Sequence, residues 1–284
     1  MHDQSVSVGR YYDRAGALFL RFGRGRESGA IHRPVWAPGV SHLQDAVSFV
    51  NRQLLMCMRE VRAVDVLDLG CGVGGTIAYL RARQKARYTG ITLSRTQAEE
   101  AGRRLHPADG PDDASSKIIQ GNFAVLDTHE VQAGSYDLVY AVESMVHLAS
   151  VDTFFASAAR YGRPDSTLIV IDDFQKRFPL EGSARYRRFQ TYTWGWRVPS
   201  VVSYDELVSA ARRHGYRLEE FRDWTVYVSA HGTRDYFLRV FVPFLKLGSR
   251  YSEWCRSMVG GDALKRLLLE EVVGYGFFRF SLTR

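Results

Sequence analysis

The segment that most constrains the fold of this 284-residue chain is VLDLGCGVGG, at residues 66–75. An apolar run of β-forming residues leads directly into closely spaced glycines, and helical sequence follows. Glycine lets a backbone turn tightly and approach another part of the chain closely. The segment therefore predicts a strand that ends in a glycine turn and continues into a helix.

The same alternation continues along the chain. Strands are expected at Val64–Leu69, Tyr88–Thr92, Ser116–Gln120, Tyr136–Val142 and Thr167–Ile171, and helices at about Gly75–Gln84, Ser94–Leu105 and Val151–Tyr161. Short β-rich runs that alternate with helices predict an α/β fold. We expect a doubly wound, mostly parallel sheet with helices on both faces.

The flanking segments add further elements. These are a helix at Ser41–Val61 with Ser41 as its N-cap, a helix at Tyr204–His214 with Gly215 at the C-cap position, a strand at Arg217–Arg222, more helix across about Thr233–Leu269, and a strand at Gly276–Leu282 that alternates like an edge strand. We expect residues 1–60 to form an N-terminal helical lid. Residues 61–284 would form the main domain, with an inserted lid at about 174–200 and a helical insertion at about 233–269.

Composition narrows the class of protein. With 45% hydrophobic residues the chain can bury a large core. Cys57, Cys71 and Cys255 lack the spacing of a structural zinc site, and they indicate a reduced, cytoplasmic setting. No signal segment is evident, and the most apolar later stretch, Tyr236–Leu247, is too short to span a bilayer. The formal charge of +7 fits an anionic ligand, a nucleic acid or an acidic surface.

Details around the glycine turn exclude the common nucleotide sites. Asp68 stands just before the glycines, where a carboxylate would repel a pyrophosphate and would suit a cationic ligand. The second strand ends in ITLS, at residues 91–94, and not in the acid that a nicotinamide ribose needs. No Gly-Lys-Ser/Thr follows the turn, so a phosphate-binding loop of that type is excluded. A plain turn without a ligand is the alternative.

Several motifs, in this order, resemble those of class I S-adenosylmethionine-dependent methyltransferases. They are DLGCGVGG at 68–75, GITLS with Gln97 at 90–97, GNF at 121–123 and YDLV at 136–139. The second motif is similar to that of cyclopropane synthases and sterol C-methyltransferases. The resemblance implies a seven-stranded, Rossmann-like methyltransferase fold and S-adenosyl-L-methionine as the cofactor.

The resemblance also implies which residues hold the cofactor. Those facing its methionine and ribose parts would be Asp68, Gly70, Gly72, Thr92, Leu93 and Gln97, and those facing its adenine Asn122 and Phe123. Many family members have Asp at the Asn122 position. Tyr12 resembles the tyrosine of an N-terminal Tyr-Asp element that lies against the cofactor, and an ordinary packed aromatic is the alternative.

The residues after the fourth strand indicate what receives the methyl group. The sequence AVESMVH at 141–147 lacks the proline pair found in many amino- and nucleobase-methylating enzymes. Glu143 follows a strand, where doubly wound folds place their chemistry. It would act as a general base if burial raises its pKa, or it would hydrogen-bond the cofactor or the substrate without taking a proton. His147 would share a helical face with Glu143 and orient it or a water, or it would simply be packed.

The insertion after the fifth strand is rich in aromatic and basic residues. Between Gln175 and Ser200, a single acid, Glu181, stands against Lys176, Arg177, Arg185, Arg187, Arg188 and Arg197. Such a block is usually a solvated face, but arginines also match phosphate oxygens. If the acceptor is an alkene carbon, methylation leaves a carbocation, which aromatic rings stabilise. Trp194 and Trp196 are the aromatic residues that we expect beside it.

Four short motifs resemble those of bacterial terpene and prenyl-diphosphate C-methyltransferases. They are YYD at 11–13, LFLRFG at 18–23, IHR at 31–33 and ESM at 143–145. In that family the acid after the fourth strand is the base, and some members use Mg²⁺ on the diphosphate. Arg21, His32 and Arg187 are the residues that we expect at the head group. Asp172 and Asp173 would touch a metal or only end the strand, and no Asp-Asp-x-x-Asp cluster is present.

These patterns favour an S-adenosylmethionine-dependent C-methyltransferase. It would add a methyl group to an alkene carbon of an isopentenyl, geranyl or farnesyl type of prenyl diphosphate, through a carbocation that Glu143 deprotonates or that another double bond captures. The alternative is an O- or N-methyltransferase of a small aromatic or lipid natural product. A nucleic-acid-binding protein is a third hypothesis, but no appended RNA-binding module is evident. We expect no nucleic-acid partner, no membrane insertion and no resident metal, and a homo-oligomer stays open.

Overall fold

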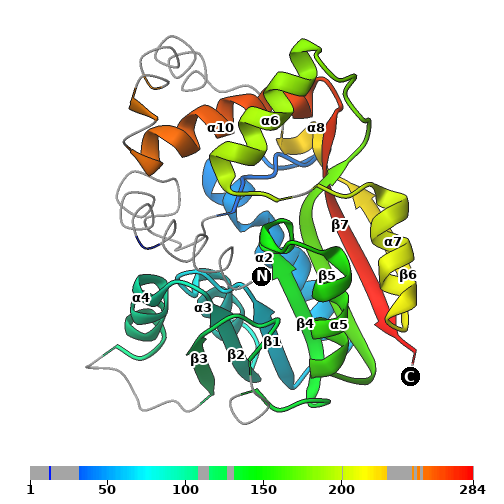
Figure 1. The fold of residues 1–284 in the computed structure, drawn as a ribbon. Helices are drawn as coiled ribbons and strands as arrows, with labels where there is room; N and C mark the ends of the chain where they lie inside the picture. Colours follow the sequence, from blue (N-terminus) through cyan, green and yellow to red (C-terminus); the bar gives the residue numbers. More distant parts are fainter. Residues whose placement is uncertain are drawn as a thin grey trace.

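The computed structural model describes residue 13 and residues 32–107, 115–126, 131–199, 201–228, 245, 248–249 and 252–283. Within these ranges, seven strands form one sheet in the order β3-β2-β1-β4-β5-β7-β6 (Figure 1). Neighbouring strands are parallel, except that β7 runs antiparallel to both β5 and β6. The predicted doubly wound, mostly parallel sheet is thereby confirmed.

The elements have the following bounds. The strands are β1 Asp65–Leu69, β2 Arg87–Thr92, β3 Ser116–Gln120, β4 Tyr136–Val142, β5 Gly162–Gln175, β6 Tyr216–Asp223 and β7 Val273–Leu282. The helices are α2 Leu43–Glu60, α3 Gly75–Arg81, α4 Arg95–Leu105, the 3₁₀ helix η1 Met145–His147, α5 Val151–Tyr161, α6 Ala184–Trp196, α7 Tyr204–Arg213, α8 Thr225–Val228 and α10 Glu253–Leu269.

Both faces of the sheet are apolar, because alternate side chains of each strand point to opposite sides. Val66 and Tyr140 pack in one core with residues of α2, α3 and α10. Leu67 and Val139 pack in a second core with residues of α5 and α7. Figure 1 shows α6, α8 and α10 beyond the end of the sheet toward which β4 runs. This is the end where a parallel sheet presents its functional residues.

The expectation of an edge strand at Gly276–Leu282 was wrong. The strand β7 lies between β5 and β6, and Phe277, Phe278 and Phe280 are fully buried. The alternation in its sequence comes from Arg279 and Ser281, which are half-buried on one face of an interior strand. Polar residues at alternate positions can thus lie on one half-buried face of an interior strand, and they do not by themselves indicate an edge strand.

Several boundaries also differ from the prediction. His42, and not Ser41, is the N-cap residue of α2, and its side chain makes no capping hydrogen bond. The strand β5 continues to Gln175, because β7 pairs with it from Thr167 onward. The strand includes the first residues of the expected lid at about 174–200, and much of the rest of that range is the helix α6. Most of the predicted helix at Thr233–Leu269 before Glu253 lies outside the described residues.

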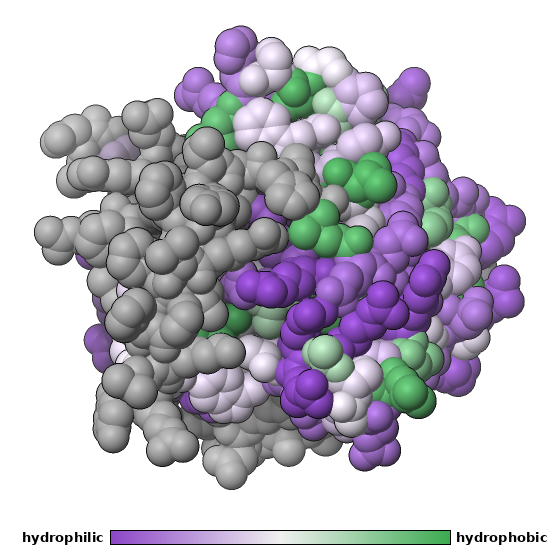
Figure 2. Space-filling model, turned by 90° about the horizontal axis from the view of Figure 1, so that it is seen from above, coloured by the Kyte–Doolittle hydropathy of each residue, from purple (hydrophilic) through white to green (hydrophobic). Residues whose placement is uncertain are grey.

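The surface at the α6 end is mainly hydrophilic, with separate apolar patches beside the undescribed residues (Figure 2). In the described ranges, every helix is too short or too polar to cross a bilayer. Cys57 and Cys71 are buried, Cys255 is half-buried, and none of the three forms a disulfide.

Candidate active site

The glycine turn after β1 makes the close backbone approach that its sequence predicted. Gly70, Gly72 and Gly74 have positive φ angles of 110°, 53° and 75°. A Cβ atom on Gly70 would lie 2.4 Å from the Cβ of Ser144, so a larger residue does not fit there without a shift. The turn therefore contacts Ser144, which directly follows Glu143 in the sequence, and this contact brings the turn close to Glu143.

Asp68 supplies the charge that a cationic ligand would need at this turn. Its side chain is almost fully buried in β1, and burial raises the pKa of its carboxyl group to about 7. A cation beside Asp68 would favour the ionised form and offset the desolvation. The methionine end of S-adenosylmethionine carries such cations, so the residues present fit this cofactor.

The end of β2 holds a second group of predicted cofactor residues. Thr92 donates a hydrogen bond to Oε1 of Gln97 at 2.9 Å, and both side chains are buried. Ser94 caps α4, and its hydroxyl also donates to Oδ1 of Asp13 at 2.6 Å. The N-terminal Tyr-Asp element thus reaches this loop through Asp13. Tyr12 itself lies outside the described residues.

Leu93, Asn122 and Phe123 complete the predicted cofactor set. Leu93 is half-buried, and Oδ1 of Asn122 accepts a hydrogen bond from the amide of Ala124 at 3.0 Å. The Phe123 ring is buried and packs edge to face on Phe154, with the ring centroids 6.2 Å apart. All of these residues follow β2 or β3 at the end of the sheet where Asp68 lies. Their contacts with a cofactor stay a prediction.

Glu143 directly follows β4 and has a left-handed backbone, with a φ of 51°. Residues other than glycine rarely adopt this conformation, and such strain is concentrated at functional sites. Its Oε1 atom accepts hydrogen bonds from the amide nitrogen of Arg33 at 2.9 Å, from Nε of Arg33 at 3.2 Å and from the Tyr275 hydroxyl at 2.9 Å. The carboxylate is therefore held by two residues that are far from it in sequence.

Arg33 joins Glu143 to a second carboxylate. Its Nη1 atom lies 2.6 Å from Oδ1 of Asp173, while the guanidinium carbon lies 4.5 Å from the centre of the Tyr275 ring. The other oxygen of Asp173 accepts a hydrogen bond from the Tyr192 hydroxyl at 2.6 Å. Strands β5 and β7, helix α6 and the segment before α2 thus meet at one half-buried cation, the guanidinium of Arg33.

A raised pKa, the condition attached above to Glu143 as a general base, is not met. Burial alone would raise it, but the charge and amide of Arg33, the nearby His32 and the Tyr275 hydroxyl together lower the pKa below the ordinary value. Glu143 is consequently ionised throughout the physiological pH range. The sequence could not show this, because the cation that outweighs burial is 110 residues away.

His147 does not share a helical face with Glu143. The helix that follows β4 is the short 3₁₀ helix η1, and Glu143 precedes it in a left-handed conformation. Burial lowers the pKa of His147, although Glu143 and Asp173 offset part of this effect. His147 is thus a neutral imidazole near both carboxylates at pH 7.

Among the residues predicted at the substrate, His32 is the one brought to Glu143. Its Nε2 atom lies 3.3 Å from Oδ1 of Asn51, and the charge of Glu143 acts on its ring. Burial nevertheless lowers the pKa of His32, so it is neutral at pH 7. Arg21 lies outside the described residues.

The other predicted substrate residues lie on α6. Trp194 is 42% exposed and packs under Arg256, whose guanidinium carbon lies 4.1 Å from its ring centre. Trp196 packs instead against α10, where a Cβ atom on Gly260 would lie 2.7 Å from its Cδ1 atom. Arg187 is exposed and donates to the carbonyl of Gly182 at 2.6 Å. The structure therefore does not bring these three residues together at Glu143.

The block of basic residues in the insertion is largely neutralised. Arg185 and Arg188 pair with Glu270, and Arg197 pairs with Glu253. Lys176 pairs with Asp223 and with Glu271, and Arg177 lies 3.7 Å from Glu271. Setting these basic residues against Glu181, the single acid of the insertion, was misleading, because the acids that pair with them belong to later segments.

Sequence reasoning missed the roles of Arg33, Tyr192 and Tyr275, and it interpreted Asp173 only as a metal contact or a strand end. The Asp172 carboxylate accepts hydrogen bonds from the amides of Val146 and Asp173, and burial raises its pKa to about 8. No group of metal-ligating side chains is assembled within the described ranges. The position of Asp173 at the end of β5 was the one available signal.

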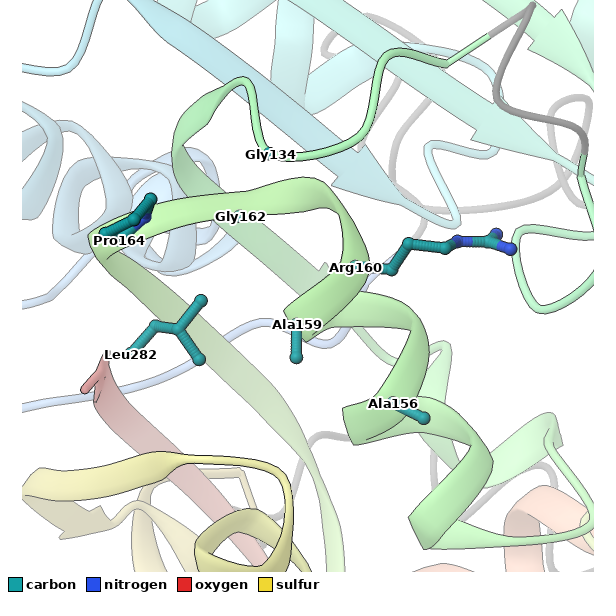
Figure 3. Close-up of a pocket in the computed structure, with 7 residues that line it drawn as sticks. All are labelled: Gly134, Ala156, Ala159, Arg160, Gly162, Pro164 and Leu282. Atoms are coloured by element: carbon teal, nitrogen blue, oxygen red, sulfur yellow. The ribbon is translucent and has the colours of Figure 1, made fainter. Parts of the chain in front are cut away.

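A cavity of about 530 Å³ lies at the other end of the sheet. It is lined by residues that include Gly134 before β4, Gly162 at the start of β5 and Leu282 at the end of β7 (Figure 3). The Arg160 guanidinium donates a hydrogen bond to the carbonyl of Phe123 at 3.2 Å. This cavity is separate from the residues around Glu143.

Comparison with known proteins gives one family match. Residues 67–170 match a family model described as a methyltransferase domain. Over 78% of this chain and 76% of the relative, the sequence is 29% identical to the O-methyltransferase cnsE of Penicillium expansum. It is 25% identical to 24-methylenesterol C-methyltransferase 2 of Arabidopsis thaliana over 66% of this chain, but only 50% of that relative is covered.

Solved structures share the fold along the chain. A geranyl diphosphate methyltransferase in complex with GPP and sinefungin has a TM-score of 0.73 at 18% identity, covering 99% of this chain and 100% of that chain. The mycolic acid cyclopropane synthase CmaA1 has a TM-score of 0.74 at 16% identity, covering 98% of both chains. At these identities the likeness is one of fold.

Proposed function

We propose that this chain, which belongs to the class I S-adenosylmethionine-dependent methyltransferases, methylates an alkene carbon of a prenyl diphosphate and that Glu143 then removes a proton. The observation that carries the proposal is the position of the Glu143 carboxylate, at the carboxyl end of β4 beside the glycine turn, together with its lowered pKa. The residues around Glu143 favour this chemistry over the removal of a proton from a hydroxyl group.

The cofactor site follows from the first part of the sheet. Asp68 would hold the cationic methionine end, Thr92 and Gln97 the ribose, and Asn122 the adenine, as the family resemblance implies. When bound, S-adenosylmethionine supplies a methyl group that is activated by the sulfonium charge. The chain's own contribution is to place the acceptor's double bond in line and to deal with the charge that methylation leaves on the neighbouring carbon.

A low pKa suits a base in this reaction. A C–H bond beside a carbocation is strongly acidic, so its proton leaves readily to any ionised carboxylate within reach. The lowered pKa of Glu143 then guarantees the ionised form and has little kinetic cost. A hydroxyl group is a far weaker acid, and a carboxylate of lowered pKa would be a poor base for it.

Aromatic rings near Glu143 support a positively charged intermediate. The Tyr275 ring already faces a cation, the guanidinium of Arg33 at 4.5 Å. Tyr192 is fully buried and is directed to Asp173 by its hydrogen bond. Rings and carboxylates that surround a cation in this way lower the energy of positive charge in the site.

The acceptor class rests on resemblance more than on the described contacts. Geranyl diphosphate C-methyltransferase of Streptomyces coelicolor A3(2), solved with Mg²⁺ and geranyl diphosphate, shares the fold with a TM-score of 0.70 at 15% identity, over 99% of this chain and 98% of that chain. Arg21, His32 and Arg187 as head-group contacts, and Mg²⁺ on the diphosphate, are part of the proposal. The proposal also includes the two lids expected from the sequence, at residues 1–60 and at about 174–200.

O-methylation of a small natural product is the second candidate, and His147 favours it. A neutral imidazole can accept a hydroxyl proton, and the lowered pKa of the half-buried His147 keeps it unprotonated at pH 7. The O-methyltransferase relative from Penicillium expansum covers more of this chain than the sterol relative does. In this reaction Glu143 would orient the acceptor without taking a proton.

Parallel incubations separate the two reactions. The full chain, S-adenosylmethionine and Mg²⁺ are combined with isopentenyl, dimethylallyl, geranyl or farnesyl diphosphate, and with a panel of phenols. Products are identified by mass spectrometry after phosphatase treatment. We expect a gain of one methylene unit from one diphosphate, reduced by a factor of about 100 or more in Glu143→Gln. The control is Glu219→Gln, at an exposed residue of β6. Methylation of phenols alone would reject the proposal.

A further inference from the structure

All hydrogen bonds of the Glu143 carboxylate to described residues fall on one oxygen. The amide and Nε of Arg33 and the hydroxyl of Tyr275 donate to Oε1, at 2.9, 3.2 and 2.9 Å. An oxygen with this many donors has its lone pairs engaged and is the weaker proton acceptor of the two. The two oxygens of Glu143 are therefore chemically different in this site.

Arg33 is fixed on both sides. Its Nη1 atom is held by Asp173 at 2.6 Å, so the guanidinium spans two carboxylates. The backbone that follows it is tied to the core by a hydrogen bond from Val35 to Ala46 at 2.9 Å. Val35 is fully buried. The guanidinium is thus a built part of the site and not a passing contact of a surface side chain.

We propose that Arg33 is a positioning residue which, together with Tyr275, anchors Oε1 of Glu143 so that Oε2 is the atom that takes the proton. This inference rests on the proposed function. In the step concerned, the C–H bond beside the cationic carbon breaks, its electron pair forms the new double bond and the proton moves to Oε2. The anchored carboxylate can reach hydrogens on one side of the cation only, which selects one alkene isomer.

The charged and titratable groups that face Glu143 come from every element packed around it. They are His32 and Arg33 from the segment before α2, His147 from η1, Asp173 from β5 and Tyr275 from β7, with Asp172 next to Asp173. Arg33 is the only one of these that carries a fixed positive charge. It therefore dominates both the ionisation of Glu143 and its orientation.

The positioning role predicts a change in product, and not only in rate. In Arg33→Met the carboxylate loses the Nε donor and the charge of the guanidinium, while the backbone amide of residue 33 still donates to Oε1. The carboxylate is then held less firmly, so we expect the share of minor alkene isomers to rise about tenfold or more. Since this variant also leaves Asp173 unpaired, Tyr275→Phe provides a milder change that removes one hydroxyl. Arg213→Met is the control, because Arg213 pairs with Asp152 in an exposed position.

The ionisation of Glu143 can be measured without an acceptor. With glutamate labelled at the carboxyl carbon, the NMR signal that disappears in Glu143→Gln is assigned to this residue. We expect it to titrate at least about one pH unit higher in Arg33→Met than in the native chain, and unchanged in Arg213→Met. The acid limb of the methylation rate should move in the same direction.

The outcomes separate the inference from the proposed function. An unchanged isomer ratio in both Arg33→Met and Tyr275→Phe would overturn the positioning role, even if the rate falls. An unchanged Glu143 titration in Arg33→Met would overturn the anchoring by charge. If the native chain methylates no prenyl diphosphate, the proposed function fails and so does the role of Oε2. The titration would then still report whether Arg33 holds the carboxylate ionised.

Discussion

Asp68 couples cofactor binding to pH. Its carboxyl group is buried without a described cation beside it, and burial raises its pKa to about 7. A bound cation stabilises the ionised form, so binding at lower pH must expel a proton. We expect the dissociation constant of S-adenosylmethionine to rise by up to about tenfold for each pH unit below 7.

Isothermal titration calorimetry measures this dependence. The range from about pH 5.5 to about pH 8.5 spans about 1.5 units on each side of 7. Two buffers with different ionisation enthalpies count the released protons. Asp68→Asn should bind more weakly and lose the pH dependence in this range. Asp65→Asn is the matched control, because Asp65 begins the same strand and pairs with Arg87 at the surface. Proton release that persists in Asp68→Asn would assign the effect to another group.

Local residues of the site were predictable, and its distant partnerships were not. The turn at Gly70 and the cap at Ser94 depend on neighbours within a few positions, so their sequence patterns identify them. The bonds of Glu143 to Arg33 and Tyr275 join residues 110 and 132 positions apart. A single sequence holds no periodicity that connects them. The sign of the pKa shift at Glu143 depends on these contacts, and for this reason the sequence alone could not decide it.

At the scale of elements, α6 and α10 cross at a pair of glycines. A Cβ atom on Gly195 would lie 2.5 Å from the Cα of Gly260, and one on Gly260 would lie 2.9 Å from the Cα of Gly195. The backbones therefore touch, and neither position has room for a side chain. We expect Gly195→Val to lower the free energy of unfolding by about 1–3 kcal/mol or more, because it overpacks this crossing.

The same substitution should also affect the site, because α6 carries Tyr192 to Asp173. Thermal unfolding and the methylation rate are measured together. Gly261→Ala is the control on α10: its Cβ atom would lie 3.7 Å from Nε1 of Trp196, an ordinary contact. Since alanine favours a helix interior, Gly261→Ala should stabilise the protein by about 0.5–1 kcal/mol. A Gly195→Val variant that melts like the native chain would contradict the close crossing.

The net charge around α6 could not be predicted from the sequence, because the sequence does not show which acids pair with its arginines. Counted locally, its arginines form a strongly basic block that suggests an anionic ligand. In the folded chain Arg185 and Arg188 meet Glu270 on the segment after α10. Partly exposed pairs of this kind contribute only about 0–1 kcal/mol each. They attach the insertion to α10 and leave less positive charge for a head group than the sequence suggested.

For the molecule as a whole, the last strand closes the sheet. The strand β7 pairs with β5 on one side and β6 on the other, so the chain's final residues form its interior. It also carries Tyr275 to Glu143, which links completion of the fold to completion of the site. The sequence suggested a peripheral strand here, because a sheet position cannot be deduced from one strand's own pattern.

A chain that ends at Val272 should therefore fail to fold. It loses Val273, Phe277, Phe278 and Phe280, all fully buried. Burial of each contributes about 1.5–3 kcal/mol, and their sum is comparable to the whole free energy of unfolding of a typical domain, about 5–15 kcal/mol. A chain that ends at Leu282 keeps these contacts and loses only Thr283 and Arg284, so it should fold and bind S-adenosylmethionine. Circular dichroism melting compares the two, and a cooperative transition in the shorter chain would show that β7 is dispensable.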